Sequence, residues 1–245
     1  DHGSLEDVIQ SASPNKSVYS PRYMAMVAWA LAACRVPHSD FFWAAGTAAA
    51  SKASEGTWVA QDVANLLWAH AAVRVDAPSP LRTMARRAAE VGWNRFEPHD
   101  TSQLMWAAAK LGQHETRPSE RNAVRSILQQ TAKQTLRGGT AIVKTFEPRH
   151  LANIAYALAH WQYQCRSKGW AQLCRASFCR PVLRAVRQEA SGRLTNFKSR
   201  ELFLLVWALN AESCLPLRRL GPYAAELAKP SRTSDLDAQE LCNVL

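Results

Sequence analysis

The sequence predicts an all-α fold, namely a right-handed α-solenoid of about five helix-turn-helix repeats followed by the start of a sixth. The first observation is a short phrase, best preserved as DVANLLWA at residues 62–69, which recurs along the chain with an aromatic residue at the same place. The aromatic residues of the five complete copies are Trp29, Trp68, Trp106, Tyr156 and Trp207, at steps of 39, 38, 50 and 51 residues. The second observation is the scarcity of glycine, only 10 residues, and of β-branched runs, which disfavours a sheet.

The spacing divides the chain into a short leading segment and a repeat array. Residues 1–18 are expected to be the end of a preceding repeat or an N-terminal extension, and residues 19–245 form the array. The expected units are 19–57, 58–95, 96–145, 146–196, 197–235 and a partial unit at 236–245. Because the sixth copy stops in mid-phrase, we expect the sequence to be a fragment, or its order to stop there.

Each copy of the phrase is predicted to be the first helix of its repeat. Positions are numbered here from the aromatic residue, which is position 0. Position −10 is apolar, and position −8, where proline is tolerated as the first helical residue, is the expected start. At position −6, two residues later, most copies have an acid, which is favoured at the positive end of the helix dipole. Position −5 is apolar except at Thr101, and its distance from position −10 is that of a hydrophobic staple. The predicted starts are Pro21, Ala60, Pro98, Pro148 and Ser199.

A second helix is predicted in every unit, and a turn signal follows each of them. The predicted second helices span residues 39–53, 80–91, 120–136, 171–189 and 219–229. Units three and four carry about a dozen extra residues, around 137–144 and 162–169, which are expected to lengthen the loop or the second helix.

Composition restricts the class of partner and the compartment. A net charge of +10 and a pI near 9.6 favour a polyanionic partner, although a basic surface without a partner is the alternative. Hydrophobic residues make up 47% of the chain, yet no apolar run approaches a membrane span, and the first ten residues do not resemble a secretory signal. The six cysteines form no CxxC pair and are expected to be reduced.

The recurring phrase resembles the octotricopeptide repeat, and it is similar also to the repeats of FAST-kinase-like and RAP-domain proteins. Residues 60–71, AQDVANLLWAHA, fit the family's core best, and Leu111-Gly112 match its helix ending. The resemblance covers residues 19–245, and it departs at the two units of about 50 residues and at Tyr156, which stands in place of tryptophan. It implies RNA binding in a mitochondrion or, alternatively, a chloroplast.

A polar strip on the first helices is the predicted RNA-binding surface. Positions −7, −3, +1 and +4 share one side of the helix, whereas −5, −2, −1 and +2 pack on the partner helix. Alanine at +1 would allow a close approach. Amides and arginines hydrogen-bond exposed base edges, but solvation of −7 and backbone hydrogen bonds by −3 between repeats are open alternatives. The predicted contacts at these two positions are Arg22, Gln61, Asn65, His99, Gln103, Arg149, Asn153 and Arg200.

Rows of arginine on the second helices form a second predicted surface. Spacings of four and seven residues place side chains on one helix face, which suits a row of phosphates, while a solvated face is the alternative. The residues are Arg82, Arg86, Arg121, Arg125, Arg180, Arg184 and Arg187. The position 0 aromatics are instead expected to be mostly buried between repeats, in preference to stacking on bases.

No catalytic residues, metal ligands or cofactors are predicted. The histidines are scattered, and Gly138-Gly139 lacks the GK[ST] ending of a phosphate-binding loop. The favoured hypothesis is a non-enzymatic organellar protein that holds single-stranded or structured RNA. It would act on rRNA or mRNA, as a transcript stability, processing or translation factor, or with other ribonucleoprotein subunits in a mitochondrial ribosome. The alternative is a protein–protein scaffold in an organellar complex.

Overall fold

The computed structural model describes residues 20–51, 57–75, 79–137, 140–169, 178–211 and 220–235. The described residues are helical and connected by turns and short loops, and none of them forms a strand. The chain divides into two compact units, one up to Ile127 and the other from Leu128, and the division falls within helix α7. The prediction of an all-α fold is therefore confirmed for these residues. The leading segment 1–18 and the partial sixth repeat at 236–245 lie outside them.

All five first helices begin at the predicted residue. The local cause is visible at their N-termini, because the side chain at position −6 accepts a hydrogen bond from the backbone N–H of position −9. This contact joins Asp62 to Val59 at 3.3 Å, and Asp100, His150 and Glu201 repeat it. It is half of a capping box and satisfies an N–H that the helix leaves unpaired. The helices are Pro21–Ala33 (α2), Ala60–Val73 (α4), Pro98–Gly112 (α6), Pro148–Ser167 (α9) and Ser199–Ala211 (α12).

The second helices follow the prediction with differences at their ends. Helix α5 has the predicted bounds, whereas α3 ends three residues early and α7 begins two residues early. Residues 171–177 and 219 of the predicted fourth and fifth helices lie outside the described residues. The helices are Ser39–Ala50 (α3), Pro80–Val91 (α5), Pro118–Leu136 (α7), Cys179–Ser191 (α11) and Gly221–Leu227 (α13).

Short helical turns occupy several places where the sequence predicts a break. Helix α8, Thr140–Val143, lies in the extra segment of unit three, and α14, Pro230–Thr233, begins at a proline predicted to be a break. Two 3₁₀ turns, η1 (Trp93–Arg95) and η2 (Leu194–Asn196), precede first helices.

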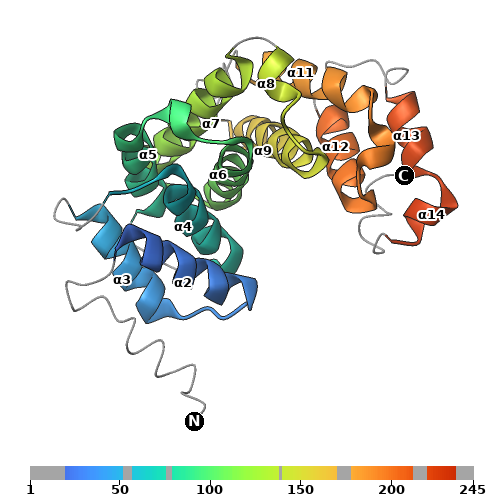
Figure 1. Ribbon diagram of the computed structural model, residues 1–245. Helices are drawn as coiled ribbons and strands as arrows, with labels where there is room; N and C mark the ends of the chain where they lie inside the picture. The colour runs from blue at the N-terminus through green and yellow to red at the C-terminus, as the bar shows by residue number, and fades with distance from the viewer. Residues whose placement is uncertain are drawn as a thin grey trace. The chain divides into compact units, whose positions relative to one another are not determined.

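In the N-terminal unit, the first and second helices form two layers (Figure 1). Helix α4 packs between α2 and α6 in one layer, α3 packs on α5 in the other, and the pairs α2–α3 and α4–α5 join the layers. In the C-terminal unit, α9 packs on α12, α11 contacts α8 and α9, and α13 packs on α12. In both units, a first helix thus contacts a neighbouring first helix and its own second helix.

The core consists of the helix positions predicted to pack on the partner helix. In α9, the residues at −5, −2, −1 and +2 are Leu151, Ile154, Ala155 and Leu158, and none has exposed surface. Both members of each predicted staple pair that the structure describes are buried. At the exception, Thr101, the hydroxyl donates to the carbonyl of Phe96 at 3.4 Å, so a hydrogen bond accompanies burial there.

Candidate nucleic-acid interface

One sector of the first helices keeps accessible surface, and α4 shows it most clearly; on α6 and α9, Gln103 at −3 and His160 at +4 are buried. Between Gln61 and Ala72, every residue of α4 is buried except four, namely Gln61, Asn65, Trp68 and Ala72. These are positions −7, −3, 0 and +4, which fall within a sector of about 60° at 3.6 residues per turn. We call the residues at these four positions of the first helices the accessible strip. The strip differs from the predicted one, since it contains position 0 and lacks position +1.

Position −7 is exposed on all five first helices. Its side chains are Arg22, Gln61, His99, Arg149 and Arg200, and all were predicted to contact RNA. Arg149 lies 2.8 Å from the exposed carboxylate of Glu147, and His99 lies 3.6 Å from Asp100. The Arg149–Glu147 pair is exposed and contributes little to stability, whereas Asp100 beside His99 is buried; both side chains at −7 remain exposed.

Two carboxylates at the N-termini of α4 and α6 lie next to position −7. Burial raises the pKa of Asp62 above its ordinary value, although a backbone hydrogen bond from Val59 and the charge of Arg22 oppose the shift. Burial likewise raises the pKa of Asp100, opposed by a backbone hydrogen bond from Glu97 and by His99. Burial thus disfavours the charged form of both carboxylates beside the strip.

Position −3 has a structural role in the N-terminal unit. The side-chain amide of Gln103 donates to the amide oxygen of Asn65 at 3.1 Å, so two predicted base-reading residues on α6 and α4 bind one another. Gln103 is also buried. Gln103 and Asn65 therefore make a contact between repeats, as the alternative proposed, but they make it through their side chains and not through the backbone. Asn153 on α9 is half-buried, and Met26 and Leu204 are apolar occupants of the same position.

Alanine at position +1 does not line an approach for a ligand, in contrast to the prediction. Ala69, Ala107, Ala157 and Ala208 have no exposed surface, and only Ala30 on α2 is exposed. Buried alanine leaves room for packing inside each unit, which explains its recurrence at this position.

The aromatics at position 0 are expected from the sequence to be mostly buried between repeats, and those on α4, α6, α9 and α12 agree, although each keeps some exposed surface. Trp29 is 46% exposed, and the residues at this position on α4, α6, α9 and α12 are half-buried. Their rings meet across neighbouring first helices. The Trp29 and Trp68 centroids lie 6.2 Å apart, and those of Tyr156 and Trp207 lie 5.3 Å apart. At position +4 of α9, His160 stacks on Tyr156 at 5.3 Å.

Two arginines of α5, Arg86 and Arg87, are bound within the protein. Arg86 donates to the carbonyl of Ala50 at 2.7 Å, and Arg87 donates to Ala49 at 3.0 Å and to Ser51 at 2.5 Å. These carbonyls close the C-terminal end of α3, where a helix leaves such groups unpaired and carries partial negative charge. The two guanidinium groups therefore cap a helix.

Arg87 has two further contacts that fix it in the core. Its guanidinium lies 5.3 Å from the centroid of the Trp58 ring and 2.7 Å from Glu90. Arg87 is not among the arginines predicted from the sequence to contact phosphates. A long cation facing a helix C-terminus is the signal that would have found this contact.

Three other predicted phosphate contacts lie around the start of α7. The carboxylate of Glu120 is almost fully buried and accepts from the backbone N–H of Arg82 at 3.3 Å, with the guanidinium of Arg82 at 4.0 Å. Arg121 donates to the carbonyl of Thr116 at 2.6 Å, and Arg125 is half-buried. Of this group, the Arg82 side chain is exposed, at 66%.

The arginines of α11 face solvent. The buried side of α11 consists of Cys179, Val182, Leu183, Val186 and Ala190. Arg180 and Arg184 lie on the opposite side and are exposed, while Arg187 is half-buried and its backbone carbonyl accepts from the Tyr223 hydroxyl at 2.7 Å. This row keeps the predicted arrangement.

Two further arginines, absent from the predictions, tie loops to the start of a repeat in the C-terminal unit. Arg193 donates to the carbonyl of Phe146 at 2.5 Å, and Arg232 donates to that of Phe197. Both phenylalanines occupy position −10. Each of these arginines therefore fastens the end of its own repeat to the beginning.

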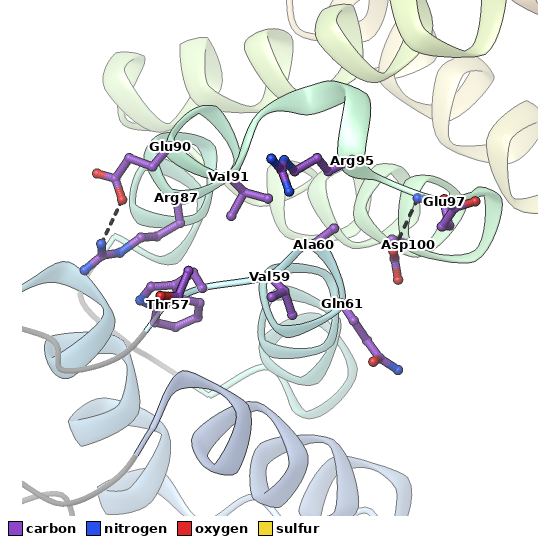
Figure 2. A pocket seen from close by; sticks show the side chains of 11 residues that line it. Thr57, Val59, Ala60, Gln61, Arg87, Glu90, Val91, Arg95, Glu97 and Asp100 are labelled. Atoms are coloured by element: carbon purple, nitrogen blue, oxygen red, sulfur yellow. Dashed lines mark hydrogen bonds and ion pairs between the residues drawn. The ribbon is translucent and has the colours of Figure 1, made fainter.

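A pocket of about 900 Å³ lies beside position −7 in the N-terminal unit (Figure 2). Arg87 and Glu90 pair on one side of it, and Glu97 and Asp100 lie on the other, with Gln61 at the end of the lining. A second pocket, of about 570 Å³, occupies the equivalent place at the start of α12. Its charged lining residues are Lys198, Arg200, Glu226, Lys229, Arg232 and Asp235.

The two pockets differ in charge although the repeat places them equivalently. Acids outnumber bases in the first, whereas four cations face two acids in the second, which suits an anion better. Glu226 of the second pocket pairs with Lys229 at 2.6 Å and with Arg232 at 2.9 Å, and these contacts hold its pKa below the ordinary value.

Among the described residues, no three His, Cys, Asp or Glu side chains are placed to hold a metal ion together. None of the described helices combines the length and the apolar character that crossing a bilayer would require. No protein-family model matches the sequence, and no curated protein matches it significantly.

Proposed function

We propose that the chain is a right-handed α-solenoid of octotricopeptide-like repeats that holds single-stranded RNA along its first helices, without catalysis. The observation that carries this proposal is the accessible strip. In both units, the part of the first helices left uncovered combines an exposed polar or cationic residue at −7 with an aromatic at 0 that keeps part of its surface exposed. Proteins that bind single strands combine cationic side chains for the backbone with aromatic rings for the bases.

The charge of the chain supports a polyanion as the ligand. The sequence carries 30 Lys and Arg against 20 Asp and Glu, and the exposed arginines of α11 add to the cations at −7. Phosphate contacts release counterions, so affinity for a single strand falls with salt by about 0.7 log units per contact for each tenfold increase in salt concentration. The α11 row and the cations at −7 are the proposed phosphate contacts. Arg86, which was predicted from the sequence as a phosphate contact, is left out of this set because its guanidinium caps α3.

The proposed place of action is a mitochondrion, with a chloroplast as the alternative. This part of the proposal rests on the resemblance of the repeat phrase to organellar RNA-binding families. The ligand would be an organellar rRNA or mRNA, and a role inside a ribonucleoprotein such as a mitochondrial ribosome fits a protein that holds RNA without altering it.

A protein–protein scaffold is the second candidate, and one observation favours it. On α2, Tyr23, Met26 and Trp29 are 37%, 56% and 46% exposed, which makes an apolar surface. Apolar residues exposed together often mark a site of protein association. The positions equivalent to Tyr23 on α4, α6 and α9 are buried, so this surface is particular to the first described repeat.

The proposal is tested by titrating the purified chain with a fluorescently labelled single-stranded RNA of about 20 nucleotides at several salt concentrations. We expect saturable binding, with a log–log salt slope that corresponds to several phosphate contacts, and weaker binding of a duplex of the same length. The matched variant replaces Arg22, Arg149 and Arg200 with Ala, and the control replaces the exposed Lys144 and Lys168 with Ala. Equal effects of the two variants would contradict the assignment of position −7. Absence of RNA binding, together with capture of a protein partner that survives ribonuclease, would favour the scaffold.

A further inference from the structure

We infer that the paired aromatics at position 0, Trp29 with Trp68 and Tyr156 with Trp207, are platforms on which unpaired bases of the bound strand stack. This inference rests on the proposed function and adds the mode of contact, by ring faces and not by hydrogen bonds to base edges. Every base has a π-face, so such a platform accepts any sequence.

The described tryptophans include both core residues and residues with exposed surface, and those at position 0 belong to the second group. Trp58 and Trp161 are core residues, 6% and 1% exposed. Trp29, in contrast, is 46% exposed, and Trp68 on the next helix is half-buried although α2 and α6 flank it. The exposure therefore persists inside the layer of first helices and is not confined to its edge.

Small neighbours keep the Trp29–Trp68 pair uncovered. On α2, the residues at +1 and +4 are the exposed alanines Ala30 and Ala33, and on α4 position +4 is the exposed Ala72. A methyl group cannot fold over an indole ring as a long side chain can. Among the described residues, the outward side of this pair is thus left open to a planar ligand.

The C-terminal unit builds its platform from three rings. His160 stacks on Tyr156 with an interplanar angle of 18°, and the Trp207 ring lies 5.3 Å from Tyr156 and 6.3 Å from His160. His160 is buried, whereas Tyr156 and Trp207 are half-buried. Because the rings already contact each other, little side-chain entropy remains to be lost on binding.

The ring distances also determine where a base can lie. Centroids separated by 5.3 and 6.2 Å are already in contact range for aromatic pairs, roughly 4.5–7 Å. A base therefore stacks on the outward side of each pair and does not insert between its rings.

Position −7 complements the platform on the same helix face. It precedes the aromatic by seven residues, which corresponds to roughly 10 Å along the helix axis. A single strand can thus place a base on the ring and a phosphate near the side chain at −7. Duplex RNA cannot do this, since its bases are stacked and paired within the helix.

The amides at −3 do not compete for the role of reading bases in the N-terminal unit. Gln103 and Asn65 hydrogen-bond each other at 3.1 Å, so base-edge recognition there would have to break that contact. Ring stacking needs no such change.

Two single-stranded ligands of equal length test the inference on the unmodified protein. One is an ordinary RNA of about 20 nucleotides, and the other has the same ribose-phosphate backbone but lacks the bases. We expect the ordinary strand to bind at least roughly tenfold more tightly and to quench tryptophan fluorescence, whereas the abasic strand binds through its phosphates with a similar salt slope.

The chain offers a matched pair of tryptophans for the variant experiment. Trp29 on α2 and Trp43 on α3 are 46% and 55% exposed, but only Trp29 belongs to a first helix. Trp29→Leu is expected to weaken binding of the ordinary strand by roughly fivefold or more and to leave binding of the abasic strand unchanged. Trp43→Leu should change neither, and Trp29→Phe, which keeps a ring, should retain most of the affinity.

The outcomes separate this inference from the proposed function. Equal affinity for the two strands, with no effect of Trp29→Leu, would overturn base stacking while leaving RNA binding through phosphates in place. Failure of both strands to bind the unmodified protein would overturn both proposals. Thermal melting of each variant establishes whether it is folded, and the comparison of the two strands requires no variant.

Discussion

The arginine rows of α5 and α11 are alike in sequence and opposite in structure. Each places arginines four residues apart on a second helix. On α5, Arg86 and the adjacent Arg87 bind the last carbonyls of α3. On α11, Arg180 and Arg184 are exposed on the side away from the core. Of these four arginines, only the two on α11 are left to bind a polyanion; the third arginine of α5, Arg82, is 66% exposed and lies 4.0 Å from Glu120.

The difference lies in what faces each row. Helix α5 packs on α3, and the unpaired carbonyls at the end of α3 offer acceptors with partial negative charge. The described residues of the C-terminal unit offer Arg180 and Arg184 no such helix end. Spacing along one helix thus places the side chains on a common face, and the neighbouring helix decides whether that face is structural or accessible.

The largest expected effect separates the two rows by stability. Arg87→Met keeps the length of the side chain but leaves the carbonyls of Ala49 and Ser51 without their guanidinium partner. Because Arg87 is 7% exposed, we expect the free energy of unfolding to fall by about 3 kcal/mol, measured by urea denaturation followed by circular dichroism.

Arg184→Met is the matched control on α11, where the side chain is exposed. Its expected effect on the free energy of unfolding is within about 0.5 kcal/mol. Similar losses for Arg87→Met and Arg184→Met would show that the two rows do not differ in structural role.

The second prediction compares the two rows by how steeply RNA affinity depends on salt. Replacing Arg180, Arg184 and Arg187 with Gln should flatten the log–log salt slope for a single strand by roughly 2 units, at about 0.7 per phosphate contact. Sequence preference should stay the same, since phosphates carry no base identity. The slope is measured by fluorescence anisotropy between low and moderate salt.

The α5 row supplies the comparison for the triple variant. Arg86→Gln should lower the free energy of unfolding and leave the salt slope nearly unchanged, because its guanidinium caps α3. If the triple α11 variant also leaves the slope unchanged, the α11 row is a solvated face. Loss of a protein partner in that variant would instead favour the scaffold.

The starts of the first helices could be predicted because their determinants are local. Proline or a small residue at −8 and an apolar residue at −10, with an acid or histidine at −6 on four helices and the Ser20 cap on α2, act within one turn, and all five starts agree. The second helices are less regular in sequence, and the prediction missed the early end of α3 at Ala50 and the short helix α14 beginning at Pro230. Packing against neighbouring repeats sets these ends, and no local pattern records it.

The candidate site was predicted only in part, for a physical reason. Helical periodicity correctly grouped −7, −3 and +4 on one face, yet the size of the aromatic at 0 suggested burial. The angular argument alone would have placed position 0 beside them, since it lies at the edge of the same sector of about 60°. The pairing of Gln103 with Asn65 and the capping by Arg87 depend on contacts between repeats, which a single helix pattern does not contain.

His70 is, like Arg87, a buried ionisable side chain of the N-terminal unit. Its ring nitrogens lie 2.8 Å from the carbonyl of Leu66 and 3.4 Å from that of Phe42, and full burial lowers its pKa below the ordinary value. Below a pH of about 6.5, the unfolded chain therefore binds a proton that the folded chain resists. Stability contributed by neutral His70 is present above that pH and is lost as the pH falls below it.

His70→Leu should remove this loss. Leucine occupies the same position, +2, at Leu31, Leu158 and Leu209, all buried, so the side chain suits the site. Between pH 7.5 and 5.5, we expect the unmodified protein to lose about 1 kcal/mol more than the variant, measured by urea denaturation at both pH values. Parallel pH dependence of the two proteins would show that His70 titrates normally in the fold.

The smallest expected effect concerns a single cation at position −7. Arg149 is exposed and lies 2.8 Å from Glu147, itself 59% exposed. Arg149→Ala should leave the free energy of unfolding within about 0.5 kcal/mol, relax preference at one nucleotide, and change the salt slope by no more than about one contact.

Glu147→Gln provides a change of opposite sign, since it removes the competing carboxylate and should tighten RNA binding slightly. If both substitutions weaken binding equally, the Arg149–Glu147 pair acts as a structural unit; if neither has an effect, this −7 residue is solvated. Tightening by Glu147→Gln that disappears in the double variant would assign the contact to the Arg149 guanidinium.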